Sequence, residues 1–201
     1  MGILGGTFNP PHIGHLACAQ AALAELGLDR VVLIPVASPP HKEIRDDPGA
    51  EHRLAMCRAA VPKGEGLEVS ALEVERGGPS YTVDTLRELH ENAPEDELTF
   101  IAGGDMAASL PAWRDPEAVL ELADFAVAER EGSARRDVEQ ALEGLQGADS
   151  VKFFPMAPVD VSSTMVRDAV AAGRPFRDLV PDRVAEYIDT HGLYRTAVSA
   201  R

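Results

Sequence analysis

Two histidines near the start of the chain could do chemistry on phosphate. His12 and His15 stand three residues apart in a segment that reads GGTFNPPHIGH from residue 5. Residues at this spacing share one face of a helix, and two protonated imidazoles offer up to four N–H donors. Glycines let backbone N–H groups approach an anion, and a helix N-terminus carries partial positive charge. Between the histidines, Gly14 would leave bare backbone for a base or ribose.

A second cluster of candidate groups follows about 150 residues later, where the chain reads SSTMVR from residue 162. Ser162, Ser163 and Thr164 supply hydroxyl groups where we expect a helix to begin, and Arg167 lies one turn further on. The hydroxyls could only cap that helix. A simple cap would not need the arginine, which binds phosphate well, so we interpret the cluster as a second phosphate-binding element.

Other phosphate and metal motifs do not fit these spacings. A Walker A loop needs Gly-Lys-Ser/Thr, the dinucleotide fingerprint needs G-x-G-x-x-G, and a zinc helix would show H-E-x-x-H with further ligands; all are missing. We therefore expect no metal site built from protein side chains. The remaining alternative is a capped helix with two surface histidines that bind nothing.

The elements that must position these groups alternate between strands and helices. Short apolar runs predict strands at 3–4, 31–36, 67–75, 98–102, 124–128 and 151–154. Helical periodicity predicts helices at 14–26, 51–61, 82–92, 133–145, 163–172 and 182–190. This order predicts the α/β class with a parallel sheet. Ligands of such sheets bind at the carboxyl ends of the strands, here after the first, second and fourth.

Composition limits the classes of partner. The chain has 201 residues, 45% of them hydrophobic, and a net charge of −14, so we expect neither nucleic acid nor an anionic membrane as a partner. No apolar run approaches the roughly 20 residues of a membrane span, and no signal peptide is recognisable at the start. Cys18 and Cys57 fall in helical patterns and suit a reducing compartment. We expect a cytoplasmic protein of one domain, residues 1–201, with a helical part at about 163–195.

The two end motifs resemble the T/S-x-x-H…H-x-G-H and I-S-S-T-x-h-R signatures (h apolar) of the nucleotidyltransferase superfamily. The segments SPPHK at 38–42, SYTVDTL at 80–86 and FIAGGD at 100–105 are similar to those of the bacterial nicotinate-nucleotide adenylyltransferases. The resemblance runs from residue 2 to about 195. It implies a Rossmann-like, doubly wound parallel sheet with a small C-terminal helical extension. It also implies transfer of the adenylyl group of ATP to nicotinate mononucleotide, giving deamido-NAD and pyrophosphate in NAD biosynthesis.

The resemblance also implies roles by position. The catalytic residues would be His12, His15, Lys42 and Arg167. ATP would contact Gly6, Thr7, Phe8, Gly14, Gly103, Asp105, Ser162, Ser163 and Thr164. Nicotinate mononucleotide would contact Asn9, His41, Thr82, Thr85 and Trp113. Thr85 would offer its backbone N–H to the nicotinate carboxylate, Trp113 would stack on the pyridine ring, and Mg²⁺ would arrive with ATP.

Several alternatives stay open at this point. Trp113 could fill the core, Lys42 could be a solvated loop lysine, and Asp105 could only cap the next helix. Pantetheine-phosphate adenylyltransferases share both end motifs but lack the segment at 80–86 and the tryptophan. A non-catalytic nucleotide sensor could use the same fold. A homo-oligomer is also left open by the sequence.

Overall fold

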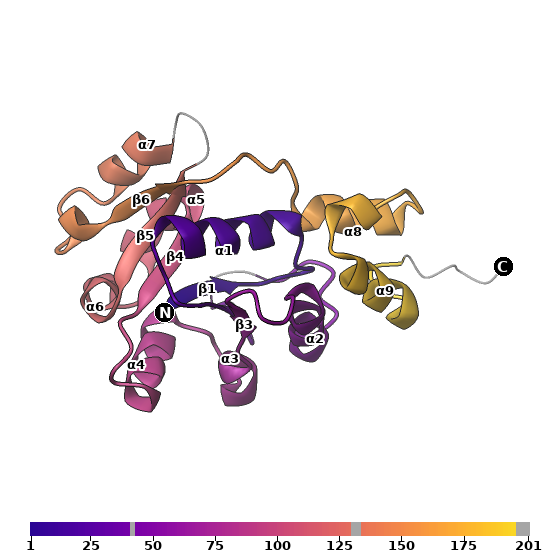
Figure 1. Ribbon diagram of the computed structural model, residues 1–201, viewed down its shortest axis with the longest axis horizontal. Coiled ribbons are helices and arrows are strands. Elements are labelled where there is room, and N and C mark those ends of the chain that lie inside the picture. Colours follow the sequence, from indigo (N-terminus) through magenta and orange to yellow (C-terminus); the bar gives the residue numbers. More distant parts are fainter. Residues whose placement is uncertain (41–42, 130–133, 196–201) are drawn as a thin grey trace.

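The computed structural model describes residues 1–40, 43–129 and 134–195, and in this part of the chain six strands form one parallel sheet (Figure 1). The strands are β1 (Gly2–Gly6), β2 (Val31–Pro35), β3 (Leu67–Val69), β4 (Thr99–Gly103), β5 (Asp124–Glu129) and β6 (Lys152–Pro155). Their order is β3-β2-β1-β4-β5-β6, and every neighbouring pair is parallel. The strand order reverses between β1 and β4. The predicted α/β class and doubly wound sheet are confirmed.

Helices connect the strands and cover both faces of the sheet. They are α1 (Ile13–Glu25), α2 (Ala50–Ala60), α3 (Leu72–Arg76), α4 (Thr82–Asn92), α5 (Gly104–Ala108), α6 (Pro116–Leu122), α7 (Ala134–Ala141), α8 (Ser163–Ala171) and α9 (Asp182–His191). Short 3-10 turns lie at Leu110–Ala112, Ala148–Ser150 and Arg177–Leu179. Among the described residues, no helix combines the length and the apolar character that crossing a membrane requires.

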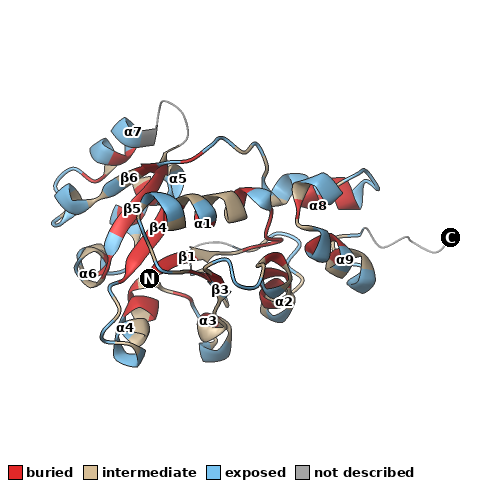
Figure 2. Cartoon of the chain, in the orientation of Figure 1, coloured by how far each residue is buried: buried red, intermediate tan, exposed pale blue. Residues whose placement is uncertain are grey.

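Strand β2 is buried on both faces, as the unbroken apolar run at 31–36 predicts. Along β2, Val31 and Leu33 pack into one core with α1 and α2. Val32 and Ile34 point the other way, into a core with α4 and α6. In Figure 2 the inner strands β4 and β5 are mostly red, the colour of buried residues. Two apolar layers therefore hold the carboxyl ends of the strands in fixed positions.

The C-terminal helices form a third core with α2. Met56 and Ala60 of α2 pack against Val166 of α8 and Val184 and Ile188 of α9. In Figure 1 these helices stand together at one end of the molecule. The predicted helical extension is confirmed as a feature of the fold. That the whole chain makes one domain stays a prediction.

Two predicted strands have different lengths in the structure. The strand predicted at 67–75 ends at Val69, because the Ser70 hydroxyl accepts a hydrogen bond from the N–H of Leu72 at 3.2 Å and α3 begins there. The first strand spans five residues rather than two, because its glycines pair with β2 like any other residue. At Gly2 an added Cβ would lie 2.8 Å from Leu28, so this glycine allows close packing.

Candidate active site

The two end motifs of the sequence meet at the carboxyl end of β1. The Ser163 hydroxyl of α8 donates a hydrogen bond to the Pro10 carbonyl at 2.8 Å. An Nη of Arg167, also on α8, donates to the Asn9 carbonyl at 2.8 Å. The N-termini of α1 and α8 are thereby joined around the segment 9–10. Two helix N-termini beside one another, with a buried arginine, favour the binding of an anion.

The two histidines cap α1 through their own rings. The Nδ1 atom of His12 accepts a hydrogen bond from the N–H of Gly14 at 3.2 Å, and the Nδ1 atom of His15 accepts from the N–H of His12 at 3.2 Å. The ring centroids lie 3.7 Å apart. A nitrogen that accepts from a backbone N–H carries no proton. A neutral ring bonded in this way has its hydrogen on Nε2. The expectation of up to four N–H donors from two protonated rings stays a prediction.

Gly14 leaves room for the His12 ring. It is buried, and an added Cβ would lie 3.1 Å from the Nδ1 and Cε1 atoms of His12. That its bare backbone also receives a base or ribose stays a prediction. Phe8 is also buried, at 1% exposed, and its ring meets the His15 ring edge-on at 4.9 Å. Both residues hold the histidines in place.

Arg167 is held from several sides. Its side chain is buried, and one Nη donates to the Thr164 hydroxyl at 3.3 Å in addition to the Asn9 contact. Its Nε atom lies 3.7 Å from an Asp46 carboxylate oxygen and has no hydrogen-bond partner in the described part of the chain. A buried N–H donor without an acceptor is unusual and is suited to an anionic ligand.

The hydroxyl groups of the second motif have protein partners. Ser162 is the N-cap of α8, and its Oγ accepts from the N–H of Met165 at 3.2 Å. Ser163 bonds to Pro10, and Thr164 accepts from Arg167. The capping that the sequence left open as an alternative is present. It occurs together with the arginine contact, so capping and anion binding do not exclude one another.

Asn9 is committed to contacts within the protein. The residue is 3% exposed; its side-chain amide donates to the Arg45 carbonyl at 2.9 Å and its Oδ1 accepts from the Tyr194 hydroxyl at 2.8 Å. Burial raises the pKa of Tyr194 well above its usual range, so this hydroxyl remains a donor at neutral pH. These contacts of Asn9 fix the first loop. Its contact with nicotinate mononucleotide stays a prediction.

Arg53 of α2 is a site residue that sequence reasoning missed. It is fully buried and donates to the carbonyls of Thr7, Val36 and Ala37 at 3.1, 2.6 and 2.9 Å. Its Nε pairs with Asp47 at 2.9 Å. It therefore joins the loops that follow β1 and β2. The available signal was an arginine on the otherwise apolar side of a predicted helix.

A cavity of about 250 Å³ opens beside these loops. We call it the Trp113 cavity; its wall combines residues of β1, β2 and β4 with α3 and the start of α4, and includes Gly6, Thr7, Tyr81, Thr82, Thr85, Phe100 and Trp113. Trp113 is half-buried, meets Phe100 edge-on at 5.7 Å and donates its indole N–H to the Ser109 hydroxyl at 2.9 Å. The tryptophan thus packs on the core with one part and lines the cavity with another.

The start of α4 presents different donors from the one expected. The N–H of Thr85 bonds to the Tyr81 carbonyl at 3.2 Å, so it does not face the cavity. The N–H groups of Thr82 and Val83 come first in the helix and have no acceptor among the described residues. These two, with the positive end of the helix, are the donors available to a carboxylate.

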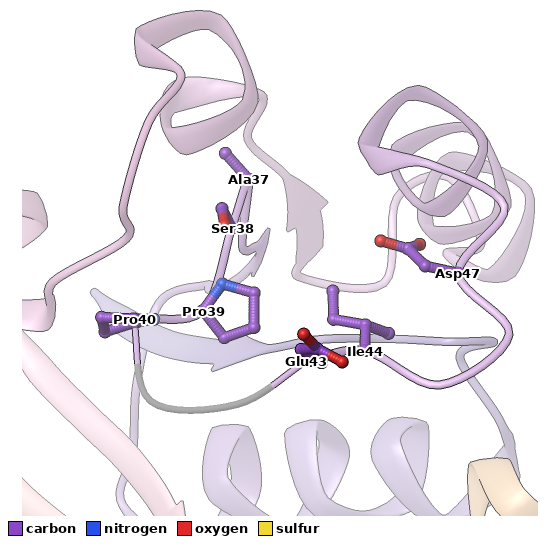
Figure 3. A pocket seen from close by; sticks show the side chains of 7 residues that line it. All are labelled: Ala37, Ser38, Pro39, Pro40, Glu43, Ile44 and Asp47. Carbon is purple, nitrogen blue, oxygen red and sulfur yellow. The ribbon is translucent and has the colours of Figure 1, made fainter.

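The loop after β2 borders a second, larger cavity of about 710 Å³ (Figure 3). Ala37, Ser38, Pro39 and Pro40 line one side, and Glu43, Ile44 and Asp47 line the other. His41 and Lys42, which were expected to contact nicotinate mononucleotide and phosphate, lie outside the described residues.

Gly103 and Asp105 lie at the carboxyl end of β4. Gly103 is the last residue of the strand and the N-cap of α5. Asp105 is exposed in the first turn of that helix and does not cap it. The alternative that this aspartate is only a cap is therefore wrong, and its carboxylate is accessible beside the point where the strand order reverses.

Comparison with known proteins decides the family. Residues 3–169 match the cytidylyltransferase-like family. The chain is 44% identical to a probable nicotinate-nucleotide adenylyltransferase of Roseiflexus sp. (strain RS-1), over 97% of this chain and 98% of that protein. It is 41% identical to one of Bordetella avium (strain 197N), over 98% of each chain. The chain belongs to the nicotinate-nucleotide adenylyltransferases.

Solved structures support the fold of this adenylyltransferase. The nicotinic acid mononucleotide adenylyltransferase of Plasmodium falciparum superposes with a TM-score of 0.71 over 96% of each chain, at 16% identity, in structures with APC and with NaAD. The family resemblance, the enzyme class and the Rossmann-like fold expected from the sequence are confirmed. The roles of individual residues stay predictions.

Proposed function

We propose that this adenylyltransferase joins nicotinate mononucleotide to the AMP part of ATP and releases pyrophosphate. The observation that carries the proposal is the meeting of the two end motifs beside the Trp113 cavity. The N-termini of α1 and α8 have the donors for phosphates, and the neighbouring Trp113 cavity has a flat aromatic wall and the N-terminus of α4. Family membership and this geometry agree.

The phosphates of ATP would lie at the N-termini of α1 and α8. The Nε2 atoms of His12 and His15 and the guanidinium of Arg167 are the donors, with Lys42 reaching in from the loop after β2. Gly6, Thr7, Gly103 and Asp105 would line the path of the nucleotide, and the exposed Asp105 carboxylate would accept from a ribose hydroxyl. Phe8, Gly14, Ser162, Ser163 and Thr164 would support this site through the contacts described above.

Nicotinate mononucleotide would occupy the Trp113 cavity. The tryptophan would cover the pyridine ring, and the N–H groups of Thr82 and Val83 would bind the carboxylate at the start of α4. A carboxylate gains more than a neutral amide from a helix N-terminus and charge-assisted hydrogen bonds. This is the physical reason to expect the acid in preference to the amide. His41 would contact the same substrate from its loop.

The reaction needs neither a general base nor a covalent intermediate. The second pKa of a phosphate monoester is about 6, so the attacking 5′-phosphate is already mostly a dianion at neutral pH. Burial raises the pKa of Cys57 well above its usual range, which keeps that thiol protonated. The task of the protein is to place two anions in line and to stabilise charge at the α-phosphate.

Mg²⁺ would enter as part of the ATP substrate. In the described part of the chain, no group of three or more His, Cys, Asp or Glu side chains could hold a metal ion. Mg²⁺ prefers phosphate oxygens and water over an all-protein cage, so the triphosphate is its natural carrier. The cytoplasmic location, the oligomeric state and the exclusion of nucleic acid remain predictions from the sequence.

The test is pyrophosphate release from Mg-ATP with nicotinate mononucleotide, nicotinamide mononucleotide and phosphopantetheine as separate acceptors. We expect release with the nicotinate nucleotide to exceed that with the amide by about tenfold or more, in line with one charge-assisted contact. Release only with phosphopantetheine would support the alternative adenylyltransferase. ATP binding without release for any acceptor would support the nucleotide sensor.

A further inference from the structure

A buried carboxyl group lies in the wall of the Trp113 cavity, and the proposed reaction does not use it. Glu73 of α3 is 5% exposed, and its Oε1 accepts a hydrogen bond from the Thr85 hydroxyl at 2.6 Å. Its Oε2 is buried and has no hydrogen-bond partner among the described residues. Burying a carboxyl group with an unpaired oxygen costs stability. The position of Glu73 therefore calls for a function.

Glu73 is the inner end of a chain of contacts between α3 and α4. Thr85 is buried on α4, and its hydroxyl oxygen also accepts from an Nη of Arg76 at 2.9 Å. The other Nη of Arg76 donates to the Glu88 carboxylate at 2.7 Å. These contacts fix the first two turns of α4 relative to α3. Of Glu73, Arg76 and Glu88, the three side chains joined in these contacts with Thr85, only Glu73 also lines the cavity.

The turn between the two helices is anchored on its other side by the loop after β2. Gly77 and Gly78 both have positive φ values, 69° and 70°, which turn the chain sharply after α3. Ser80 then donates its N–H to the Ser38 carbonyl at 2.8 Å and accepts from the N–H of Ala37 at 2.9 Å. The start of α4 is thus held by the β2 loop on one side and by Glu73 on the other.

We propose that Glu73 is a positioning residue for the second substrate, which it serves by fixing the start of α4 through Thr85. The N–H groups of Thr82 and Val83 lie one turn before Thr85 and are the donors assigned to the nicotinate carboxylate. Donors that are already in place lose little freedom when the ligand binds. This proposal rests on the proposed function, since it concerns the same cavity and the same carboxylate.

The experiment compares substrate binding by three variants with that of the unaltered enzyme. Glu73→Ala removes the acceptor for Thr85, Thr85→Val removes the donor with little change of shape, and Glu73→Gln keeps an acceptor oxygen. Calorimetry gives Kd for nicotinate mononucleotide and for Mg-ATP, and pyrophosphate release gives kcat. We expect Glu73→Ala and Thr85→Val to raise Kd for nicotinate mononucleotide about tenfold or more, which is the effect of one hydrogen bond to a charged group.

The other readouts separate positioning from a general loss of structure. Glu73→Gln should stay within about threefold of the unaltered enzyme, and Kd for Mg-ATP and kcat at saturation should stay within about threefold in every variant, because the ATP donors lie on α1 and α8. Equal weakening of both substrates, or unchanged binding of nicotinate mononucleotide in Glu73→Ala, would overturn the proposal. Thermal unfolding checks that each variant is folded. If Glu73→Ala does not fold, the Kd values of Thr85→Val decide whether the proposal holds.

The same data distinguish failure of the proposed function from failure of the proposed role of Glu73. If the unaltered enzyme binds nicotinate mononucleotide but releases no pyrophosphate, the proposed reaction fails, and the Kd series still decides the role of Glu73. If it does not bind nicotinate mononucleotide at all, both proposals are overturned.

Discussion

The chemistry of the candidate site depends on how the rings of two histidines are oriented. His12 and His15 each use Nδ1 to accept from a backbone N–H of the same helix N-terminus. This leaves Nε2 as the donor and fixes the orientation of both rings before any ligand binds. Preorganised donors of this kind contribute most when charge develops in the transition state.

Replacing His15 with Ala should lower kcat by about two to three powers of ten, the usual cost of removing one preorganised donor from a transition state. Steady-state pyrophosphate release measures it. His90→Ala, which changes an exposed histidine on α4, is the matched control and should retain full activity. A loss under about threefold in His15→Ala would contradict the assigned role.

Glu73→Gln should change stability in a pH-dependent way. Burial raises the pKa of Glu73 by more than the Thr85 hydroxyl and the charge of Arg76 lower it. A carboxyl whose pKa is raised by folding stabilises the fold fully below its unfolded pKa, near 4.3, and that stability is lost as pH rises through the folded pKa. Glutamine does not titrate. The variant should therefore gain stability relative to the parent as pH rises.

Urea unfolding of both proteins at about pH 5, 6.5 and 8 would measure this difference. Glu88 and Arg76 are unchanged between the two proteins, so their charges act on both. A stability difference that stays constant over this pH range would show that the pKa of Glu73 is not raised by folding.

At the scale of elements, the loops after β1 and β2 act as one unit because a single buried side chain joins them. Arg53 bonds to three carbonyls of these loops and to Asp47. The loops carry Thr7 on one side and the segment with His41 and Lys42 on the other. Helix α2 therefore positions the phosphate site although it contributes no group to the proposed chemistry.

Arg53→Met should destabilise the protein by about 3 kcal/mol or more, because it keeps the apolar volume but leaves buried carbonyls without donors at about 1–3 kcal/mol each. Urea unfolding measures the loss. Arg58→Met, at an exposed position on the same helix, should stay within about 0.5 kcal/mol. Equal stability of the two variants would contradict the role of Arg53 as a link between loops.

At the scale of the whole molecule, the C-terminal helices reach the first loop of the chain. Tyr194 follows α9 and donates its hydroxyl to Asn9 at 2.8 Å, and the Asn9 carbonyl accepts from Arg167 of α8. Two residues of the C-terminal part of the chain thus donate to one asparagine near its start. The helical extension is therefore part of the phosphate site rather than an appendage to it.

Tyr194→Phe should lower the free energy of unfolding by about 1–3 kcal/mol, because Asn9 loses a buried partner. It should also weaken the binding of Mg-ATP more than the binding of nicotinate mononucleotide. Calorimetric Kd values for the two substrates check this. Tyr187→Phe is the control, since it removes a hydroxyl bonded to His52 at 3.0 Å, away from the first loop. If both variants weaken the binding of Mg-ATP to the same extent, the effect does not depend on a specific link through Asn9.

The elements that the sequence predicts well are those with strong local patterns. The buried run at 31–36 predicts a strand, and the periodicity at 82–92 predicts a helix with the bounds that α4 has. The prediction of a strand at 67–75 was wrong beyond Val69. The alternation of apolar and polar residues continues past Ser70, where a side-chain hydrogen bond starts α3. Short elements of this kind depend on single contacts that periodicity does not report.

The sequence by itself determined the family, the α/β class and the two motifs of the site, because residue types and spacing express local chemistry. Only the tertiary structure decided which contacts each of these residues makes within the protein. Gly14 gives room to a histidine, Thr85 binds Glu73 through its hydroxyl, and Asn9 serves Tyr194 and Arg167. These assignments depend on hydrogen bonds between residues far apart in the chain, and the spacing of residues along a sequence contains no record of which distant donor meets which acceptor.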